Sequence, residues 1–410
     1  MATSRLADRI PRAAAVSALV LLAACGSPAA SPSATGSSAA RQSAAASLLP
    51  SGTPPLEAAP AFKRSSATAV PEGDAWSIAV GDLNSDEKPD LVTATGYPQG
   101  VVILFGHGDG TFEPGPNVHA GSSKFVKTAD LNGDGSLDLV AAGDQLAVVL
   151  GNGDGTFQPP ANYGAGQDRG TPDLNVLGLA IDDLNADAVA DLVAANWVGS
   201  QLAVLIGRGD GTFDPASAYA CPHCDAVAIA DLDADGDRDV VATGFTPGAS
   251  GSMSVFLNQG SGAMTAGPDA NPQGNTVAVA VADLNGDGNQ DVVTGNDASQ
   301  SISVLIGKGD GTFAEAQPYR AGNTHTVVVV DLDSDGQLDI LAGQGVAAKL
   351  WFYRGTGDGG LVETQGIDLT PEVAPFFAVA DLNADQRLDL AVYYAIQGVG
   401  KSWVAVLLGQ

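Results

Sequence analysis

The sequence has few basic residues. Its 410 residues include 18 Lys and Arg against 47 Asp and Glu, which gives a formal net charge of −29. Proteins that bind DNA or RNA normally neutralise phosphates with a basic patch. The shortage of positive charge therefore disfavours nucleic-acid binding. The excess of acidic side chains points either to a solubility device or to bound cations.

The apolar run near the N-terminus is short. Three arginines precede Ala13 to Ala24, a run too short to cross a bilayer as a stable anchor. It ends in Leu-Ala-Ala-Cys25, which resembles the bacterial lipobox. We expect residues 1–25 to be a lipoprotein signal peptide and Cys25 to be lipidated; the alternative is an ordinary signal peptide. Gly26 in place of Asp favours an exported chain held at the outer membrane or cell surface, which touches the membrane only through its lipid.

Residues 26–60 lack apolar periodicity. They are mostly Ala, Ser, Pro and Gly, with one Arg and one Glu. Such a tract cannot bury enough surface to order itself, so we expect a disordered tether between the anchor and the folded domain.

A nine-residue motif recurs through the rest of the chain. DLNSDEKPD begins at Asp82 and related segments begin at Asp130, Asp183, Asp231, Asp283, Asp331 and Asp381, at intervals of 48 to 53 residues. Each copy follows an apolar alternating run and precedes two more such runs. A Gly-Asp-Gly turn and a fourth extended piece follow in most units. Four short antiparallel strands per repeat of about 50 residues predict propeller blades. Residues 61–410 are therefore expected to form an all-β, seven-bladed β-propeller of four-stranded antiparallel blades.

The first run of each unit alternates large and small residues, for example Val227 and Ile229 with Ala228 and Ala230. Small residues on one face would let neighbouring blades approach near the axis. Lys127 departs from this pattern, as do Val328 and Val330 in the sixth unit.

Ring closure is also predicted. The last unit ends after its third strand, at 403–409, whereas residues 62–73 resemble the fourth pieces of the other units. We therefore expect residues near Phe62 to Val70 to complete the last blade, which would leave no free sheet edge there.

The motif begins like a calcium-binding EF-hand loop, with Asp130, Asn132 and Asp134 two apart and Gly135 next. The twelfth position, however, is Ala141 instead of Glu, and the flanks read as strands. The seven motifs together with the GDGTF turns resemble the FG-GAP or VCBS repeats of integrin α-subunit propellers and many bacterial surface proteins. That resemblance implies a calcium loop between the first and second strands, with side chains at positions 1, 3, 5 and 9 and the carbonyl of position 7 as ligands.

The chemistry of the side chains agrees with that implication, because Ca²⁺ prefers six to eight oxygen ligands in flexible geometry. The expected ligands at positions 1, 3, 5 and 9 are Asp82, Asn84, Asp86 and Asp90; Asp130, Asn132, Asp134 and Asp138; Asp183, Asn185, Asp187 and Asp191; Asp231, Asp233, Asp235 and Asp239; Asp283, Asn285, Asp287 and Asp291; Asp331, Asp333, Asp335 and Asp339; and Asp381, Asn383, Asp385 and Asp389. The alternative is that some loops use Asp and Asn only for turn chemistry. Glu87, Ala188 and Gln386 replace glycine at position 6, which would weaken those three sites if that position needs a positive φ.

A partner would bind on the other face. The motif loops and the Gly-Asp-Gly turns must share one end of the propeller, because consecutive strands alternate direction. Aromatic and polar residues recur at the opposite end, namely Trp76, Tyr97, Trp197, Phe245, His325, Phe376 and Tyr394. Exposed aromatic side chains suit a glycan or a protein partner. The competing interpretation is that these residues simply pack over the rim.

No catalytic constellation is visible. The four histidines share no common repeat position, and no nucleophile lies in a recognisable pattern with a base. Cys221 and Cys224 are expected to form a local disulfide in an exported protein. The sequence therefore favours a monomeric, non-catalytic, calcium-stabilised propeller that binds a protein or glycan. The alternatives are a polysaccharide-acting lyase or hydrolase and a structural envelope subunit.

Overall fold

The structure is a computed structural model, and it describes residues 58–70, 76–96, 100–166, 176–244, 252–344, 349–369, 376–395 and 402–410. The predicted signal peptide, with Cys25, and residues 26–57 of the predicted tether lie outside the described residues. The described residues form strands joined by turns and loops, and they contain no helix that could cross a membrane.

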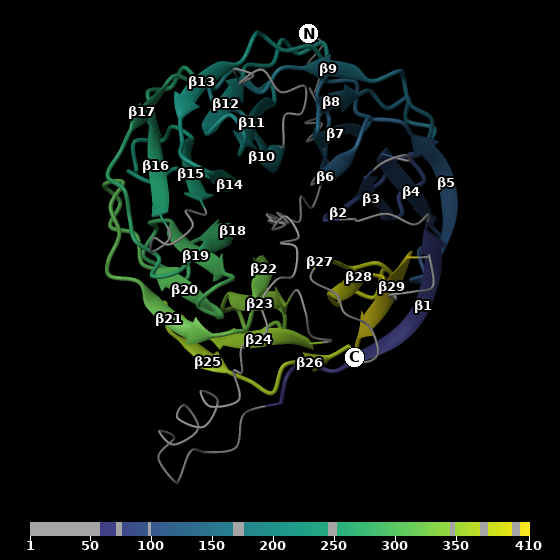
Figure 1. The fold of residues 1–410 in the computed structure, drawn as a ribbon. Coiled ribbons are helices and arrows are strands. Elements are labelled where there is room, and N and C mark those ends of the chain that lie inside the picture. The colour runs from purple at the N-terminus through teal and green to yellow at the C-terminus, as the bar shows by residue number, and fades with distance from the viewer. Residues whose placement is uncertain are drawn as a thin grey trace, which may run out of the picture.

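Seven antiparallel sheets are arranged in a ring, with the first strand of each nearest the centre (Figure 1). Blade 1 comprises β2 (Ile78–Gly81), β3 (Asp90–Gly96), β4 (Gly100–Gly106) and β5 (Phe112–Val118); blade 2 comprises β6 (Ser123–Ala129), β7 (Asp138–Gly143), β8 (Leu146–Val149) and β9 (Ala161–Tyr163). Blade 3 comprises β10 (Val176–Asp182), β11 (Asp191–Asn196), β12 (Gln201–Leu205) and β13 (Ser217–Ala220); blade 4 comprises β14 (Cys224–Ala230), β15 (Asp239–Gly244), β16 (Ser252–Asn258) and β17 (Met264–Ala266).

The remaining blades follow the same order. Blade 5 comprises β18 (Thr276–Ala282), β19 (Asp291–Asn296), β20 (Ser301–Leu305) and β21 (Gln317–Arg320). Blade 6 comprises β22 (Thr324–Val330), β23 (Asp339–Gln344), β24 (Lys349–Gly355) and β25 (Leu361–Glu363), with β26 (Ile367–Asp368) also paired to β24. Blade 7 comprises β27 (Phe376–Ala380), β28 (Asp389–Ala395), β29 (Ser402–Gly409) and β1 (Phe62–Val70). The predicted seven-bladed propeller is confirmed.

Ring closure occurs as the sequence predicts. Strand β1 pairs antiparallel with β29, from Phe62 opposite Gly409 to Val70 opposite Ser402, with a bulge between Arg64 and Ser66. In Figure 1 the purple β1 lies outside the yellow β29, beside the C-terminus. The Ser66 hydroxyl also donates to the carbonyl of Gly110 in blade 1 at 2.7 Å. The N-terminal strand therefore joins the last blade and contacts the first.

Seven clusters of buried residues fill the boundaries between neighbouring blades. Between blades 4 and 5, Ala226, Ala228 and Ala230 of β14 pack against Val279 and Val281 of β18. One face of each first strand thus carries mostly small side chains, and it packs against larger side chains on the facing side of the next blade. Burying this apolar surface between every pair of sheets is the main force that holds the ring together.

Two first strands carry larger side chains where the pattern predicts small ones, and their surroundings differ. Val328 and Val330 pack into the boundary with blade 7, where they meet Phe377 and Val379. Lys127 occupies the corresponding inner-strand position in blade 2, and burial lowers the pKa of its ammonium group to about 8. Blade 2 therefore carries a cation where the other first strands are apolar.

Replacing Lys127 with alanine, which five other blades have at this position, should raise the free energy of unfolding at pH 7 by about 1–3 kcal/mol. The unfolded chain keeps this proton up to the usual lysine pKa of 10.5, whereas the folded chain releases it near pH 8. The stability of the wild type should therefore rise between those two pH values, and the advantage of alanine should shrink. Urea denaturation at pH 7 and pH 10 checks this, with Lys308→Ala, at an exposed site, as the control. An equal gain at both pH values would contradict the explanation.

Candidate metal centre

The seven motif loops lie between the first and second strands of the blades. In blade 4, β14 ends at Ala230, the loop begins at Asp231, and β15 begins at Asp239, which pairs with Ala230. The Gly-Asp-Gly turns join the third and fourth strands at the same end of the ring. The turn of one blade reaches the loop of the preceding blade, since Gly311 N donates to the Leu232 carbonyl at 3.0 Å. We call this end the motif face.

The loop backbone folds around its acidic side chains. In all seven loops, the position-1 carboxylate accepts the backbone N–H of position 6 at 2.8 to 3.1 Å. The position-5 carboxylate accepts the N–H of position 7 at 2.7 to 3.0 Å. These bonds turn the side chains at positions 1 and 5 inward, as a metal loop requires.

The aspartate at position 9 is the most buried member of each loop. All seven are 0% exposed: Asp90, Asp138, Asp191, Asp239, Asp291, Asp339 and Asp389. One oxygen accepts the N–H of the position-2 leucine at 2.8 to 3.0 Å. The other accepts a backbone N–H at or just beyond the end of the third strand, at 2.7 to 3.0 Å. This carboxylate ties the loop to the sheet and still has lone pairs for an ion.

Burial raises the pKa of the position-9 carboxyl group in every loop, to about 6 for Asp90, Asp239 and Asp339. The backbone N–H donors oppose this shift, and the nearby loop carboxylates add to it in most loops. A cation in the loop favours the charged form and would offset the cost of burial.

Position 6 has a positive φ in every loop, including 66° at Glu87, 65° at Ala188 and 69° at Gln386. Position 4 also has a positive φ in all seven loops, which the sequence does not reveal because that position holds Ser, Ala or Gly. Each loop therefore needs two left-handed residues, and a side chain at either one is strained.

Changing Gly288 to alanine should lower the free energy of unfolding by about 1 kcal/mol, because a Cβ meets nothing within 4 Å and only backbone strain is added. The converse change, Ala188→Gly, relieves strain but adds freedom to the unfolded chain, so it should raise stability by less than about 1 kcal/mol. Urea titrations in excess calcium measure both variants. Destabilisation of similar size in the two would refute the role given to φ.

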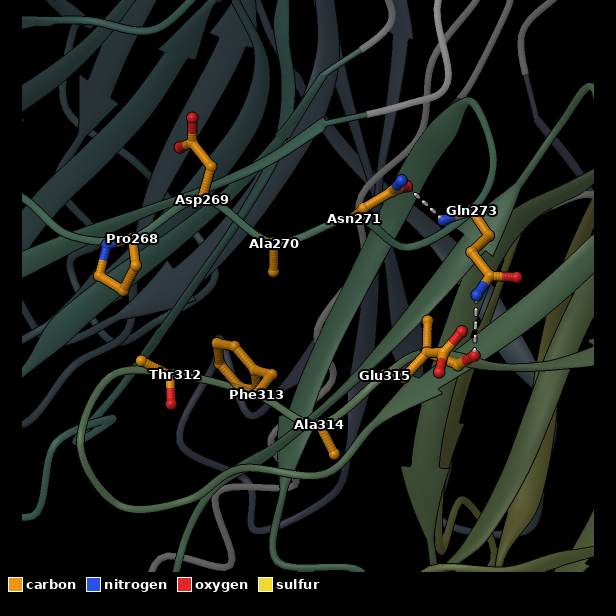
Figure 2. Close-up of a pocket in the computed structure, with 10 residues that line it drawn as sticks. Pro268, Asp269, Ala270, Asn271, Gln273, Thr312, Phe313, Ala314 and Glu315 are labelled. Carbon is orange, nitrogen blue, oxygen red and sulfur yellow. Dashed lines mark hydrogen bonds between the residues drawn. The ribbon is translucent and has the colours of Figure 1, made fainter.

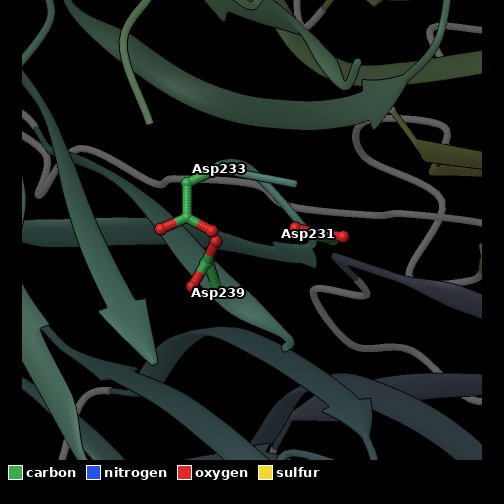
Figure 3. A group of neighbouring side chains, drawn as sticks. All are labelled: Asp231, Asp233 and Asp239. Carbon is green, nitrogen blue, oxygen red and sulfur yellow. The ribbon is translucent and has the colours of Figure 1, made fainter. Parts of the chain in front are cut away.

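Two loops bring three carboxylates together. One oxygen each from Asp231, Asp233 and Asp239 lies within 4.8 Å of the others in blade 4, and the same holds for Asp331, Asp333 and Asp335 in blade 6. Figure 3 shows the Asp233 and Asp239 carboxylates turned toward one another.

The blade 4 loop fits a hard cation. The Oδ1 atom of Asp231 is buried and has no hydrogen-bond donor. Burial and the charge of Asp235 raise the pKa of Asp233. A donor set made only of oxygen, with one buried oxygen left unsatisfied, is what Ca²⁺ would complete. These acidic clusters could hold a metal ion, and its identity as calcium remains a prediction.

Two of the aromatic residues predicted for the opposite face gather near the axis, because each first strand starts at that face. Trp76 stacks on Phe376 with ring centroids 6.5 Å apart and meets Phe125 edge-on at 6.3 Å. The ammonium group of Lys124 lies 4.7 Å from the centre of the Trp76 ring. Blades 7, 1 and 2 contribute these four residues, which we call the aromatic cluster. Phe125 and Lys124 are not among the residues predicted from the sequence, although they stand at the same distances before their motif as Phe376 and Trp76 do.

The other predicted partner residues are spread out. Trp197 lies 5.6 Å from His223, between ring centroids, at the boundary of blades 3 and 4. His325 is paired with Asp297 at 3.5 Å. Tyr394 is 4% exposed, stacks on Trp403 in blade 7 and accepts a hydrogen bond from Arg64 at 2.8 Å. Tyr97 and Phe245 lie outside the described residues.

Cys221 and Cys224 are joined by a disulfide in the link between blades 3 and 4. Both are buried, with exposures of 2% and 0%. The disulfide closes a short turn in which His223 has a φ of 54°.

A cavity of about 320 Å³ lies on the outer rim between blades 4 and 5 (Figure 2). Its lining includes Phe313, Asp269, Asn271 and Glu315. In Figure 2 the Phe313 ring lies below Ala270, while the Asp269 carboxylate points away from it. A second cavity, of about 160 Å³, lies between blades 6 and 7 and is lined by Arg64, Leu369 and Tyr394 among others. Neither cavity contains the His325–Asp297 pair.

Three solved structures illustrate the similarity of fold at low sequence identity. A lectin from Agrocybe aegerita that recognises non-reducing terminal N-acetylglucosamine is 22% identical, with a TM-score of 0.51, over 76% of this chain and 81% of that one. BBS1N in complex with ARL6DN is 9% identical, with a TM-score of 0.60, over 85% and 97%. The periplasmic gluconolactonase of Pseudomonas aeruginosa is 16% identical, with a TM-score of 0.53, over 72% and 85%.

No curated protein matches the chain. The model of the FG-GAP-like repeat matches six times, at residues 82–141, 130–194, 183–242, 231–294, 283–342 and 331–392. Each match runs from one motif loop through the next, so the matches follow the blade repeat. The chain belongs to the FG-GAP-like repeat family.

Proposed function

We propose that this protein is a calcium-stabilised propeller that binds a protein or glycan partner through the face opposite the motif loops and does not catalyse a reaction. The aromatic cluster carries this proposal. Three aromatic side chains from three blades meet at one end of the ring, and a lysine ammonium lies over the ring of Trp76. Phe125 and Phe376 are buried, at 2% and 6% exposed, whereas Trp76 and Lys124 are partly exposed, so these two side chains are the part of the cluster open to a ligand.

A partly exposed indole ring with a neighbouring cation suits both proposed partner classes, because it offers apolar area together with a hydrogen-bond donor. The similar propellers include one that recognises terminal N-acetylglucosamine and one in complex with a protein. At these identities the likeness concerns the fold alone. It supports the proposal only in that proteins of this fold can serve either kind of partner.

Replacing Trp76 with alanine should weaken partner binding at least about tenfold, since central aromatic anchors dominate binding free energy. A glycan array and an envelope-extract pull-down with the mature chain identify the partner, and titration then measures the loss. Trp351→Ala is the matched control, because Lys349 lies 4.1 Å from the Trp351 ring on another blade. Equal binding by the Trp76 variant and the wild type would contradict the proposed face.

A lyase or hydrolase is the second candidate, and one pair of side chains favours it. His325 Nε2 lies 3.5 Å from Asp297 Oδ1, and both are partly exposed, at 21% and 26%. The hydrogen bond from His325 holds the pKa of Asp297 below its usual value. Such a pair can act as a general base. Polysaccharide turnover that Asp297→Asn abolishes would favour this candidate over the binding proposal, and absence of turnover would favour binding.

A structural envelope subunit is the third candidate. It would bind no small ligand and would co-purify with another envelope protein in stable proportion. The same pull-down and glycan array separate it from a glycan receptor.

We further propose that the chain is held at the bacterial envelope by a lipid on Cys25. A Cys25→Ser protein should appear in the soluble fraction, whereas the wild type should pellet with membranes and incorporate labelled palmitate. Membrane association of the Ser variant at wild-type level would exclude this form of anchoring.

A further inference from the structure

The seven motif loops differ in one residue at or just beyond the end of the third strand. This residue comes directly before the one whose backbone N–H donates to the position-9 aspartate. It is apolar in six blades, namely Phe105, Leu150, Ile206, Leu257, Ile306 and Leu408, and it is Arg354 in blade 6.

The apolar residues pack against the next blade. At each of these six boundaries the apolar side chain lies against a glycine in the turn of the next blade. A Cβ placed on that glycine would lie only 2.4 to 3.1 Å from the side chain. The distance is 2.5 Å between Gly155 and Phe105 and 3.1 Å between Gly311 and Leu257. Blade 6 is followed by blade 7, whose fourth strand β1 comes from the other end of the chain. Blade 7 therefore has no turn between its third and fourth strands, and the residue before Gly355 has no such glycine to contact.

Arg354 instead reaches the motif loop of its own blade. Its Nε lies 2.8 Å from Asp333 Oδ2, with the two side chains 37% and 16% exposed. Asp333 is the position-3 residue of a loop with four carboxylates. The other four-carboxylate loop, in blade 4, has Leu257 at this position, and Asp231 Oδ1 there lacks a donor.

We propose that Arg354 is a built-in counter-ion that replaces calcium in the blade 6 loop. The guanidinium pairs with one of the carboxylates the ion would need, and its charge repels a divalent cation at the same place. The blade 6 loop therefore binds Ca²⁺ at least about tenfold more weakly than the blade 4 loop. The loop beside the ring closure then stays ordered without calcium. This inference rests on the proposed calcium sites.

The test counts calcium bound to the mature chain by equilibrium dialysis at about 1 mM Ca²⁺, within the range for extracellular modules. Asp331→Asn in blade 6 should lower the count much less than Asp231→Asn in blade 4 does. Arg354→Leu should raise the count, and adding Asp331→Asn to it should remove that gain. Leu257→Arg should reproduce the loss seen with Asp231→Asn.

The outcomes separate this inference from the calcium proposal. A loss of bound calcium in Asp331→Asn equal to the loss in Asp231→Asn would overturn the role of Arg354 and leave the calcium sites standing. No bound calcium in the wild type would overturn both. The Asp331 and Asp231 variants keep the test decisive even if Arg354→Leu fails to fold.

Discussion

Removing calcium should lower the midpoint of thermal unfolding by on the order of 10 °C. The position-9 aspartates are 0% exposed, and burial raises their pKa, so without a cation each ionised loop weakens the fold. A site with a dissociation constant of 10⁻⁴ to 10⁻³ M contributes about 1.4–2.7 kcal/mol at about 10 mM calcium. With four or more sites filled, the summed contribution exceeds about 5 kcal/mol.

Differential scanning calorimetry of the mature chain in calcium and in excess chelator measures this shift. Returning calcium should restore the midpoint, and magnesium should restore less of it because it demands octahedral geometry and keeps its waters. Asp231→Asn in calcium should show part of the loss, since it removes one carboxylate from the blade 4 cluster. A midpoint that does not move in chelator would show that the loops use their aspartates only for turn chemistry.

Deleting residues 60–72 should lower the free energy of unfolding by on the order of 5 kcal/mol, because it removes the strand that completes blade 7. The lost contacts are the ladder from Phe62 to Val70 along β29 and the bond from Ser66 to blade 1. The deletion also leaves β29 as an open edge, so the shortened protein should self-associate. Urea denaturation and analytical ultracentrifugation measure the two effects.

A synthetic peptide with residues 58–72 supplies the control. Added to the shortened protein, it should pair with β29 and recover much of the lost stability in a concentration-dependent way. A peptide with the same composition in scrambled order should not. Unchanged stability on deletion would contradict closure by β1.

The architecture could be predicted from the sequence because the repeat fixes it. Seven motifs at nearly constant spacing define seven equal units, and the missing fourth strand of the last unit identifies β1 by elimination. Alternation of small and large residues in the first strands likewise predicts which faces meet, as the Ala226 to Ala230 face and Val279 show. These features follow from local patterns that can be recognised in the sequence before the fold is known.

Other features depend on which blades become neighbours, and a single repeat does not reveal them. Lys124 and Phe125 join Trp76 and Phe376 only because blades 7, 1 and 2 are adjacent in the closed ring. The sequence predicts that Tyr394 is exposed on the partner face, yet it lies in the core of blade 7, where Trp403 stacks on it. The positive φ at position 4 leaves no signature, because Ser, Ala and Gly all occupy that position.

Anomalous diffraction from crystals grown in calcium tests the central claim most directly, namely that the motif loops are metal sites that hold the blades together. A peak is expected in the blade 4 loop among Asp231, Asp233 and Asp239, with at least three more in other loops and a weak or absent peak beside Arg354 in blade 6. Absence of any peak among the seven loops, at a calcium concentration of about 10 mM that would fill extracellular sites, would contradict the account.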